Sequence, residues 1–253
     1  MGRPQHGSAS DRRGHPDGTG ADAILRNVRS TGITVHDYRD YHDYIDSFVT
    51  EDEALAAARE RGQELGCLPV GPGSGAALRF LAGALAARAV VELGTGAGSS
   101  GLCLLRGMAS NGVLTSIDIE PEHQRVARQA FTEAGFPPSR YRLIMGQALD
   151  VLPRLTDGGY DLVFVDAAGP EYPLYLEAGV RLLRPGGVIA FHNALAHCRG
   201  DDPVPRDPSA AALRAVGTMI RDDDNLLPLL LPLGDGLLLA LRIDRGMETY
   251  PAH

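Results

Sequence analysis

The sequence contains no lysine, although it has 253 residues and 24 basic side chains, all of them arginine. No lysine can therefore act as a general base, form a Schiff base or bind a phosphate. Acidic residues outnumber basic ones, and the formal net charge at pH 7 is −8. Nucleic-acid binding depends on a basic surplus that releases counterions from phosphates. We therefore expect no nucleic-acid partner.

Cysteine is also scarce, and long uninterrupted apolar runs are missing. The three cysteines, Cys67, Cys103 and Cys198, show no CxxC spacing, which is typical of reduced thiols in a cytoplasmic protein. The N-terminal residues have no apolar core of the kind found in signal peptides. The richest apolar stretch, 226–243, is broken by two prolines and a Gly-Asp-Gly sequence. It predicts a β-hairpin, so we expect no membrane association.

Short apolar segments alternate with helix-length segments from residue 89 onward. The expected strands cover 89–93, 112–117, 141–145, 161–165 and 187–192, and the expected helices cover 100–108, 121–135, 148–155, 172–183 and 209–222. Such alternation indicates βαβ units and a parallel sheet covered on both faces. We predict the α/β class with a doubly wound, mostly parallel sheet and a C-terminal antiparallel hairpin.

The chain divides by composition into four segments. Residues 1–21 form a polar tail, 22–88 a helical extension, 89–245 the α/β core and 246–253 a C-terminal tail. We expect the extension and the core to form one domain.

The extension contains two predicted helices and a tyrosine-rich segment. Thr50 and the acidic residues after it predict an N-cap for a helix that continues to Leu65, and a second helix follows from about Gly75. Tyrosines 38, 41 and 44 recur every third residue. Their stripe fits either a packing face, against the core or a second subunit, or a substrate lid.

A glycine-rich turn follows the first predicted strand. Glycines at 94, 96 and 98 allow a sharp turn and close approach of a ligand to the backbone. A dinucleotide fingerprint would place a third glycine at 99, which is Ser99 here. Glu92 precedes the turn and suits an ammonium group better than a pyrophosphate. Asp118 ends the next strand, at about the spacing expected of a carboxylate that binds ribose hydroxyls.

Several motifs together resemble class I S-adenosylmethionine-dependent O-methyltransferases of the caffeoyl-CoA and catechol type, especially their shorter actinobacterial members. The motifs lie between Tyr44 and Ile243 and are YIDSF, VVELGTGAGSSGL, TSIDIEPEH, GQALDVLPRL, YDLVFVDAAGPEYPLY, LLRPGGVIAFHN and LLPLGDGLLLAL. The resemblance implies a Rossmann-like methyltransferase fold, S-adenosylmethionine as cofactor, a small-molecule acceptor from secondary metabolism, and a homodimer.

The resemblance also implies a set of cofactor-binding residues. Glu92, Ser100 and Val70 would surround the methionine moiety together with the backbone of Gly94, Thr95 and Gly96. Asp118, with Ile119 beside it, would bind the ribose, and Ala148 would border the adenine. Asp166 would face both the cofactor and the acceptor.

The acceptor side departs from the family pattern. Asp166 and Asn193 match two ligands of the family's divalent cation, but His192 replaces the carboxylate between them, and Gly169 replaces the usual lysine base. Tyr172 matches an aromatic position next to the substrate. With fewer carboxylates the site suits Mg²⁺ poorly and Zn²⁺, Fe²⁺ or Ni²⁺ better. Alternatively no metal binds, and His192 is the general base, assisted by Asp166.

Two further functions remain open from the sequence. Loss of the diol-binding metal site would also suit an N-methyltransferase acting on a natural-product scaffold. An intact cofactor loop beside an altered acceptor site would suit a catalytically inactive binding protein. His123, on a predicted helix, is expected to be a solvent-facing residue without a functional contact.

Overall fold

The computed structural model describes residues 35–167, 169–195 and 208–243. The predicted tails and Cys198 lie outside these ranges. The chain divides into two units, residues 1–43 and 44–253, with the boundary inside helix α2. In the first unit the described residues form the start of α2, and all other elements belong to the second.

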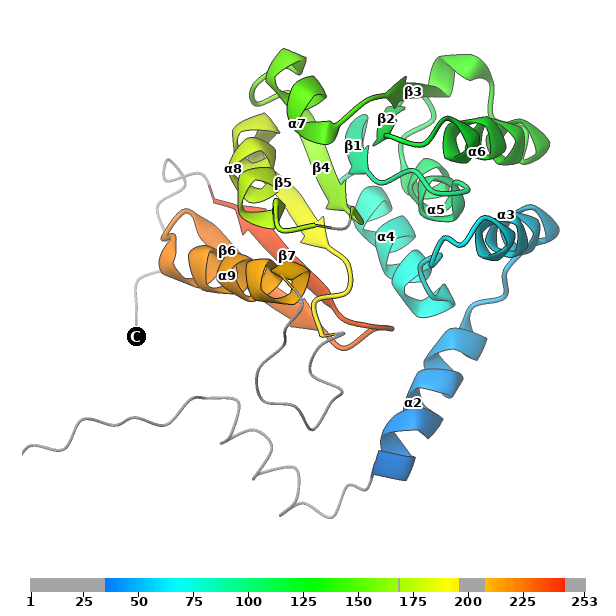
Figure 1. The fold of residues 1–253 in the computed structure, drawn as a ribbon, viewed down its shortest axis with the longest axis horizontal. Coiled ribbons are helices and arrows are strands. Elements are labelled where there is room, and N and C mark those ends of the chain that lie inside the picture. The colour runs from blue at the N-terminus through cyan, green and yellow to red at the C-terminus, as the bar shows by residue number, and fades with distance from the viewer. Residues whose placement is uncertain (1–34, 168, 196–207, 244–253) are drawn as a thin grey trace, which may run out of the picture. The chain divides into compact units, whose positions relative to one another are not determined.

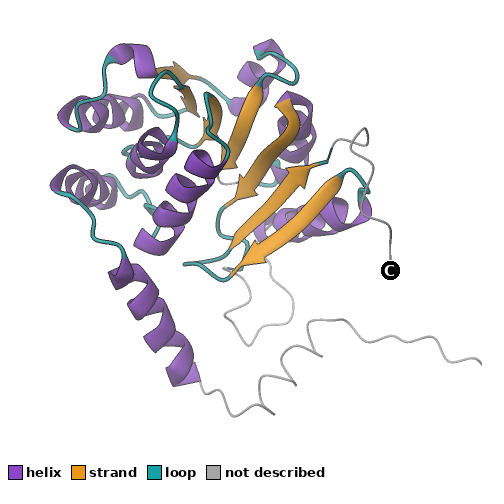
Figure 2. Cartoon of the chain, turned by 180° about the vertical axis from the view of Figure 1, so that it is seen from behind, coloured by secondary structure: helices purple, strands orange, loops and turns teal. Residues whose placement is uncertain are grey.

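The second unit contains a seven-stranded sheet and its flanking helices (Figures 1 and 2). Helix α2 (Val35–Phe48) crosses the boundary between the units. The helices that lie wholly in the second unit are α3 (Glu53–Glu64), α4 (Pro72–Ala84), α5 (Ser99–Gly107), α6 (Pro121–Glu133), α7 (Ala148–Val151), α8 (Tyr172–Leu182) and α9 (Pro208–Asp222), with 3₁₀ turns at Pro138–Arg140 and Leu152–Arg154. The strands are β1 (Ala89–Leu93), β2 (Val113–Asp118), β3 (Tyr141–Met145), β4 (Tyr160–Val165), β5 (Leu183–Phe191), β6 (Leu226–Leu231) and β7 (Leu237–Arg242).

The strand order is β3-β2-β1-β4-β5-β7-β6. The first five strands are parallel, while β7 pairs antiparallel with β5 and β6 antiparallel with β7. The predicted doubly wound, mostly parallel sheet with a C-terminal hairpin is therefore confirmed. From β1 the chain adds β2 and β3 on one side and then returns to add β4 and β5 on the other side, so the topological switch point lies between β1 and β4. Proteins of the α/β class bind ligands at this point.

Alternate residues of the central strands build two separate cores. Val90 of β1 and Phe164 of β4 belong to the core beneath α3 to α6. Their neighbours Val91 and Val163 belong to the core beneath α8 and α9. Because side chains of a strand point alternately to opposite faces, a sheet covered on both sides requires apolar residues at nearly every position. This requirement explains why the central strands are continuous apolar runs.

Three element boundaries differ from the prediction. Thr50 was expected to cap α3, but the cap is Asp52, whose carboxylate accepts the N–H of Leu55 at 2.9 Å. Helix α4 begins at Pro72, which suits the first helical position because it has no N–H to leave unpaired. Strand β5 begins at Leu183, before the Pro-Gly-Gly sequence, and the register shift opposite β4 accommodates the extra residues.

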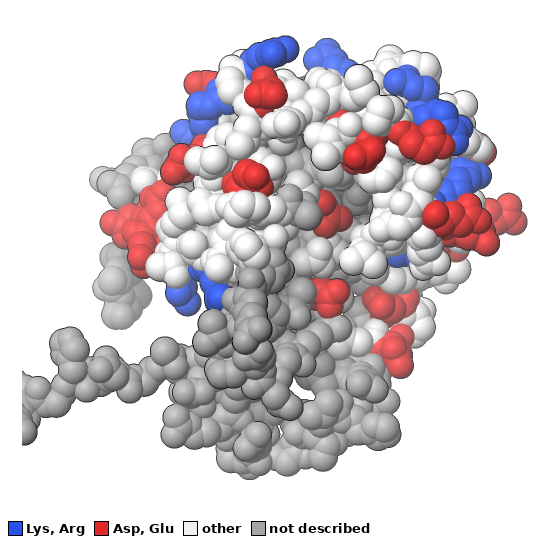
Figure 3. All heavy atoms as spheres, viewed as in Figure 1, with Lys and Arg blue, Asp and Glu red and all other residues white. Residues whose placement is uncertain are grey.

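The charged side chains are distributed unevenly over the face seen in Figure 3. Arginines lie mainly around the rim of that face, while its centre carries acidic and uncharged side chains. Within the described ranges, no helix combines the length and apolar character needed to span a bilayer.

Candidate active site

The residues that follow β1, β4 and β5 lie side by side at the carboxyl edge of the sheet. The N–H of Asp166 donates to the carbonyl of Leu93 at 2.8 Å, and the N–H of His192 donates to the carbonyl of Val165 at 3.0 Å. Each bond extends the parallel ladder one residue beyond the strand. Gly94, Asp166 and His192 are thereby aligned at the topological switch point, although they are distant in sequence.

The turn after β1 requires glycine for two reasons. Gly94 has a φ of +92°, and a Cβ at this residue would lie 2.4 Å from the carbonyl oxygen of Asp166. At the other end of the turn, Gly98 adopts the left-handed conformation and precedes the first residue of α5. The turn therefore brings bare backbone and the N–H groups of a helix terminus to the carboxyl edge, which is a suitable surface for a polar ligand.

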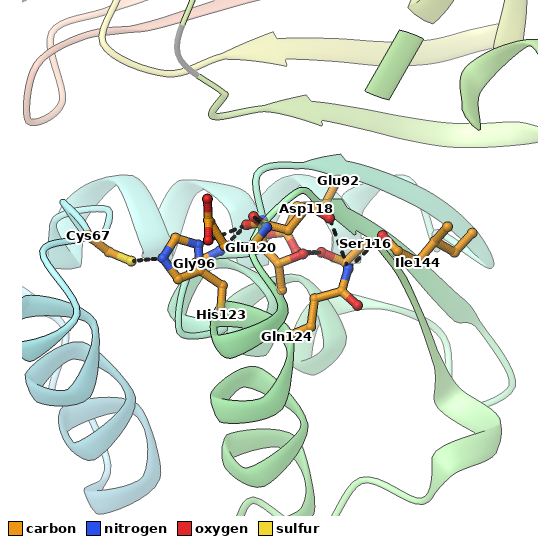
Figure 4. A network of polar contacts seen from close by, with 10 residues as sticks. Cys67, Glu92, Gly96, Ser116, Asp118, Glu120, His123, Gln124 and Ile144 are labelled. Atoms are coloured by element: carbon orange, nitrogen blue, oxygen red, sulfur yellow. Dashed lines mark hydrogen bonds and ion pairs between the residues drawn. The ribbon is translucent and has the colours of Figure 1, made fainter. Parts of the chain in front are cut away.

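Asp118, the last residue of β2, fixes this turn through its carboxylate. Its Oδ2 accepts the N–H of Thr95 at 2.9 Å and the N–H of Gly96 at 3.0 Å. Its Oδ1 accepts the N–H of Glu120 at 2.9 Å (Figure 4). A carboxylate oxygen has more than one lone pair, so Oδ1 retains capacity for a further donor.

Glu92 is fully buried one residue before the end of β1. The hydroxyl of Ser116 donates to one carboxylate oxygen at 2.5 Å (Figure 4). The hydroxyl of Ser100 donates to the other at 2.6 Å, and Ser116 also pairs with the hydroxyl of Thr95 at 2.7 Å. Burial raises the pKa of Glu92 to about 7; the two serine bonds oppose this increase, and the charges of Asp166 and Asp118 add to it. Glu92 is therefore an acid poised near neutrality behind the glycine turn.

Asp166 and His192 form a hydrogen-bonded pair. Nδ1 of His192 lies 2.9 Å from Oδ1 of Asp166, and the histidine is 5% exposed. Burial alone would lower the pKa of His192, but the hydrogen bond and the charge of Asp166 outweigh it, with a further contribution from Asp235. The pKa is therefore raised above its ordinary value. Asp235 belongs to the β6–β7 turn, whose carbonyl groups accept the N–H groups of residues 194 and 195.

The remaining predicted cofactor residues lie around the glycine turn in different environments. Val70 is buried just before α4, and its carbonyl oxygen accepts a guanidinium N–H of Arg59. Ile119 follows Asp118 and is 61% exposed, which leaves its side chain available for a ligand. Ala148 begins α7 after β3. The cofactor contacts of these three residues remain predictions.

The two predicted acceptor residues, Asn193 and Tyr172, have different structural constraints. Asn193 follows His192 with a φ of +61°, a conformation that asparagine tolerates better than most residues. Tyr172 is 5% exposed, and its ring packs edge-on against Tyr175 and Phe191. Its substrate contact remains a prediction, and its ring has a clear packing role.

Three polar residues at the site were missed or misjudged from the sequence. Ser116 lies opposite Glu92 in the β1–β2 register, a relation that strand pairing could have revealed. His123 was expected to face solvent, but this prediction was wrong: its side chain is 24% exposed and lies between Asp118 and the thiol of Cys67. Helix α6 begins at Pro121, three residues after Asp118, so its first turn lies close to that carboxylate. No sequence pattern indicated the contact with Cys67.

A doubly wound sheet with a glycine turn after β1 and a carboxylate at the end of β2 defines an α/β protein that binds a nucleoside-type cofactor. Residues 46–243 match the O-methyltransferase family model. The chain belongs to this family, as the resemblance predicted.

Individual relatives agree with this assignment. A Mycolicibacterium vanbaalenii protein, whose O-methyltransferase name is itself inferred, is 55% identical over 77% of this chain and 86% of its own. A Corynebacterium glutamicum structure has 33% identity and a TM-score of 0.75, covering 81% of this chain and 97% of its own. The O-methyltransferase TomG of Streptomyces achromogenes, involved in tomaymycin synthesis and solved with S-adenosylmethionine, has 30% identity and a TM-score of 0.73, covering 81% and 96%.

Proposed function

We propose that this protein is an S-adenosylmethionine-dependent O-methyltransferase that methylates a hydroxyl of a small, aromatic or natural-product molecule. The observation that carries the proposal beyond family membership is the Asp166–His192 pair, which lies beside the glycine turn and can remove a proton. A hydroxyl acceptor must lose its proton on methylation, and a correctly oriented base beside it supplies this step.

The cofactor is supported by the chemistry of the residues around the turn. We assign the methionine moiety to the Gly94–Gly96 backbone, with Ser100, Glu92 and Val70 around it. Asp118 suits the ribose because Oδ1 retains a lone pair, with Ile119 beside it, and Ala148 borders the adenine. Bound S-adenosylmethionine supplies an electrophilic methyl group on a sulfonium centre.

His192 is the proposed general base. The bond to Asp166 holds the proton on Nδ1, so that Nε2 carries the lone pair that can accept the hydroxyl proton. Asp166 then stabilises the imidazolium that forms, in agreement with the raised pKa of His192. Asn193 and Tyr172 are the proposed neighbours of the acceptor.

The donor set suits a hard divalent cation poorly. Asp166 is the one carboxylate among the three candidate ligands, and its Oδ1 faces Nδ1 of His192 directly at 2.9 Å. Within the described residues, no three His, Cys, Asp or Glu side chains are grouped to hold a metal ion. Because Mg²⁺ prefers several oxygen ligands, we propose that proton removal here uses the imidazole and requires no added metal.

A methyl-transfer assay against phenols, catechols and amines tests this function. We expect phenolic products, turnover that persists in the presence of a chelator, and a loss of at least about 100-fold in His192→Ala. If the chelator abolishes turnover, proton removal depends on a bound metal ion. If His192→Ala turns over as fast as the parent, His192 is not the general base. Products formed with amines alone would favour N-methylation.

We further propose that the protein is a cytoplasmic homodimer. Support for the dimer comes from β6, one of the two edge strands of the sheet, where Leu227, Leu229 and Leu230 are each about half exposed. Exposed apolar side chains in one strand favour an interface. Light scattering would give twice the chain mass of 26.9 kDa, whereas a monomer at assay concentration would contradict the dimer.

The cytoplasmic location is supported by the cysteines, because Cys67 and Cys103 are unpaired thiols, which suits a reducing compartment.

A further inference from the structure

A cysteine, a histidine and an aspartate form a continuous chain of contacts on the cofactor side of the sheet. Sγ of Cys67 lies 3.3 Å from Nε2 of His123, and Nδ1 of the same ring lies 3.3 Å from Oδ2 of Asp118 (Figure 4). Cys67 belongs to the connection between α3 and α4, while His123 lies in the first turn of α6. The fold therefore joins a nucleophile, a base and a carboxylate from three separate segments.

The thiol also lies against the glycine turn. A Cβ built on Gly96 would be 3.9 Å from Sγ of Cys67, so the sulfur faces the bare side of this glycine. The N–H of Ala97 forms a hydrogen bond that stabilises the thiolate. Cys67 is partly exposed. Any group added to this sulfur must occupy space beside Gly96 and Asp118.

The charge state of the thiol determines how it can react. Burial raises the pKa of Cys67, the charge of Asp118 raises it further, and the bond from Ala97 offsets part of the increase. At neutral pH the sulfur is therefore protonated, and attack on an electrophile requires a base to accept the proton. Nε2 of His123 is within reach of that proton, and Asp118 can stabilise the resulting imidazolium.

We propose that Cys67 is a covalent modification site, activated by His123, and that its reaction with a small electrophile closes the cofactor site. With hydrogen peroxide, the sulfur attacks one oxygen, the O–O bond breaks and an S–O bond forms. The thiol proton passes through His123 to the leaving hydroxide, so that cysteine and peroxide give sulfenic acid and water. Loss of cofactor binding rests on the proposed function, because it requires the cofactor to lie beside Gly96.

The chain provides an internal control thiol. Cys103 is 4% exposed in the core between α4 and α5, and burial raises its pKa to about 11. It should remain unmodified under conditions that label Cys67. Cys198 lies outside the described residues, so the measurements use a Cys198→Ser background.

Iodoacetamide labelling followed by intact mass and peptide mapping tests the proposal on the full-length protein. We expect one adduct, on Cys67, with at least tenfold slower labelling in the presence of saturating S-adenosylhomocysteine. His123→Gln keeps a polar side chain but provides no base, and it should label at least tenfold more slowly at pH 7. After treatment with iodoacetamide or peroxide, calorimetry should show at least tenfold weaker binding of S-adenosylhomocysteine, except in Cys67→Ala.

Each alternative outcome contradicts a specific part of the proposal. Labelling of Cys103 in preference to Cys67, or equal rates in His123→Gln and the parent, would overturn the base-assisted thiol. Adducts on Cys67 that leave S-adenosylhomocysteine affinity unchanged would overturn the closing of the site. Untreated protein that does not bind S-adenosylhomocysteine would refute the proposed function instead, and peptide mapping would still decide the reactivity of Cys67.

Discussion

Replacing Glu92 by glutamine should change how the stability of this protein depends on pH. Glu92 is fully buried, and its pKa is raised from 4.5 to about 7. Between these values the unfolded chain releases the proton while the folded chain keeps it, so stability falls as pH rises. At about 1.4 kcal/mol for each pKa unit, the loss by pH 7.5 is about 3 kcal/mol. Glutamine cannot ionise, and it can still bond with the hydroxyls of Ser100 and Ser116.

Denaturant unfolding between pH 4.5 and 7.5 measures this effect. The free energy of unfolding of Glu92→Gln, minus that of the parent, should grow by about 3 kcal/mol across the range. Glu60→Gln, a change at an exposed glutamate of α3, should give a constant difference. A constant difference for Glu92→Gln as well would show that Glu92 titrates as an ordinary carboxyl and would refute the reasoning from burial.

Three more predictions concern the site and its support. Asp166→Asn removes the charge that raises the pKa of His192, so the rise of kcat/KM with pH should move to lower pH; an unmoved profile would exclude His192 as the titrating base. Gly94→Ala should cost more than about 2 kcal/mol of stability in denaturant melts, because a clash with Asp166 adds to the left-handed strain of about 1–2 kcal/mol. Gly135 has a φ of +81° and no atom near a built Cβ, so Gly135→Ala should lose only the stability that corresponds to the left-handed strain. Equal losses of stability in Gly94→Ala and Gly135→Ala would show that the clash with Asp166 contributes nothing. Phe164→Ala should cost about 3–5 kcal/mol in the same melts, and a loss below 1 kcal/mol would contradict its place in the core.

The sheet was predictable because its strands carry local information. A buried parallel strand such as β4 must be apolar at nearly every position, and that run is visible in sequence. The hairpin was visible for a similar reason, since Gly234 and Gly236 supply the positive φ values of its turn. The start of β5 was not predicted, because Pro-Gly-Gly indicates a turn, and only the pairing of Leu183 and Val188 with β4 on either side of it places it within the strand.

The positions of the candidate site residues were predictable at the level of strand ends. Asp118, Asp166 and His192 each end or follow a parallel strand, so their proximity to the carboxyl edge follows from the fold. The contact between Cys67 and His123 was not predictable, since it joins residues 56 positions apart on a loop and a helix. Such contacts depend on tertiary packing, which no local pattern encodes.

The central claim is that the glycine turn and Asp118 bind the methyl donor, and calorimetric titration with S-adenosylmethionine tests it most directly. The titration compares the parent with Asp118→Ala and with the control Asp222→Ala, which changes an exposed acidic residue at the end of α9. Hydrogen bonds to a charged group contribute about 1.5–3 kcal/mol each, so Asp118→Ala should bind at least tenfold more weakly, while Asp222→Ala should match the parent. An absence of binding by the parent, or equal affinities for the parent and Asp118→Ala, would contradict the assignment of the turn and its carboxylate to the methyl donor.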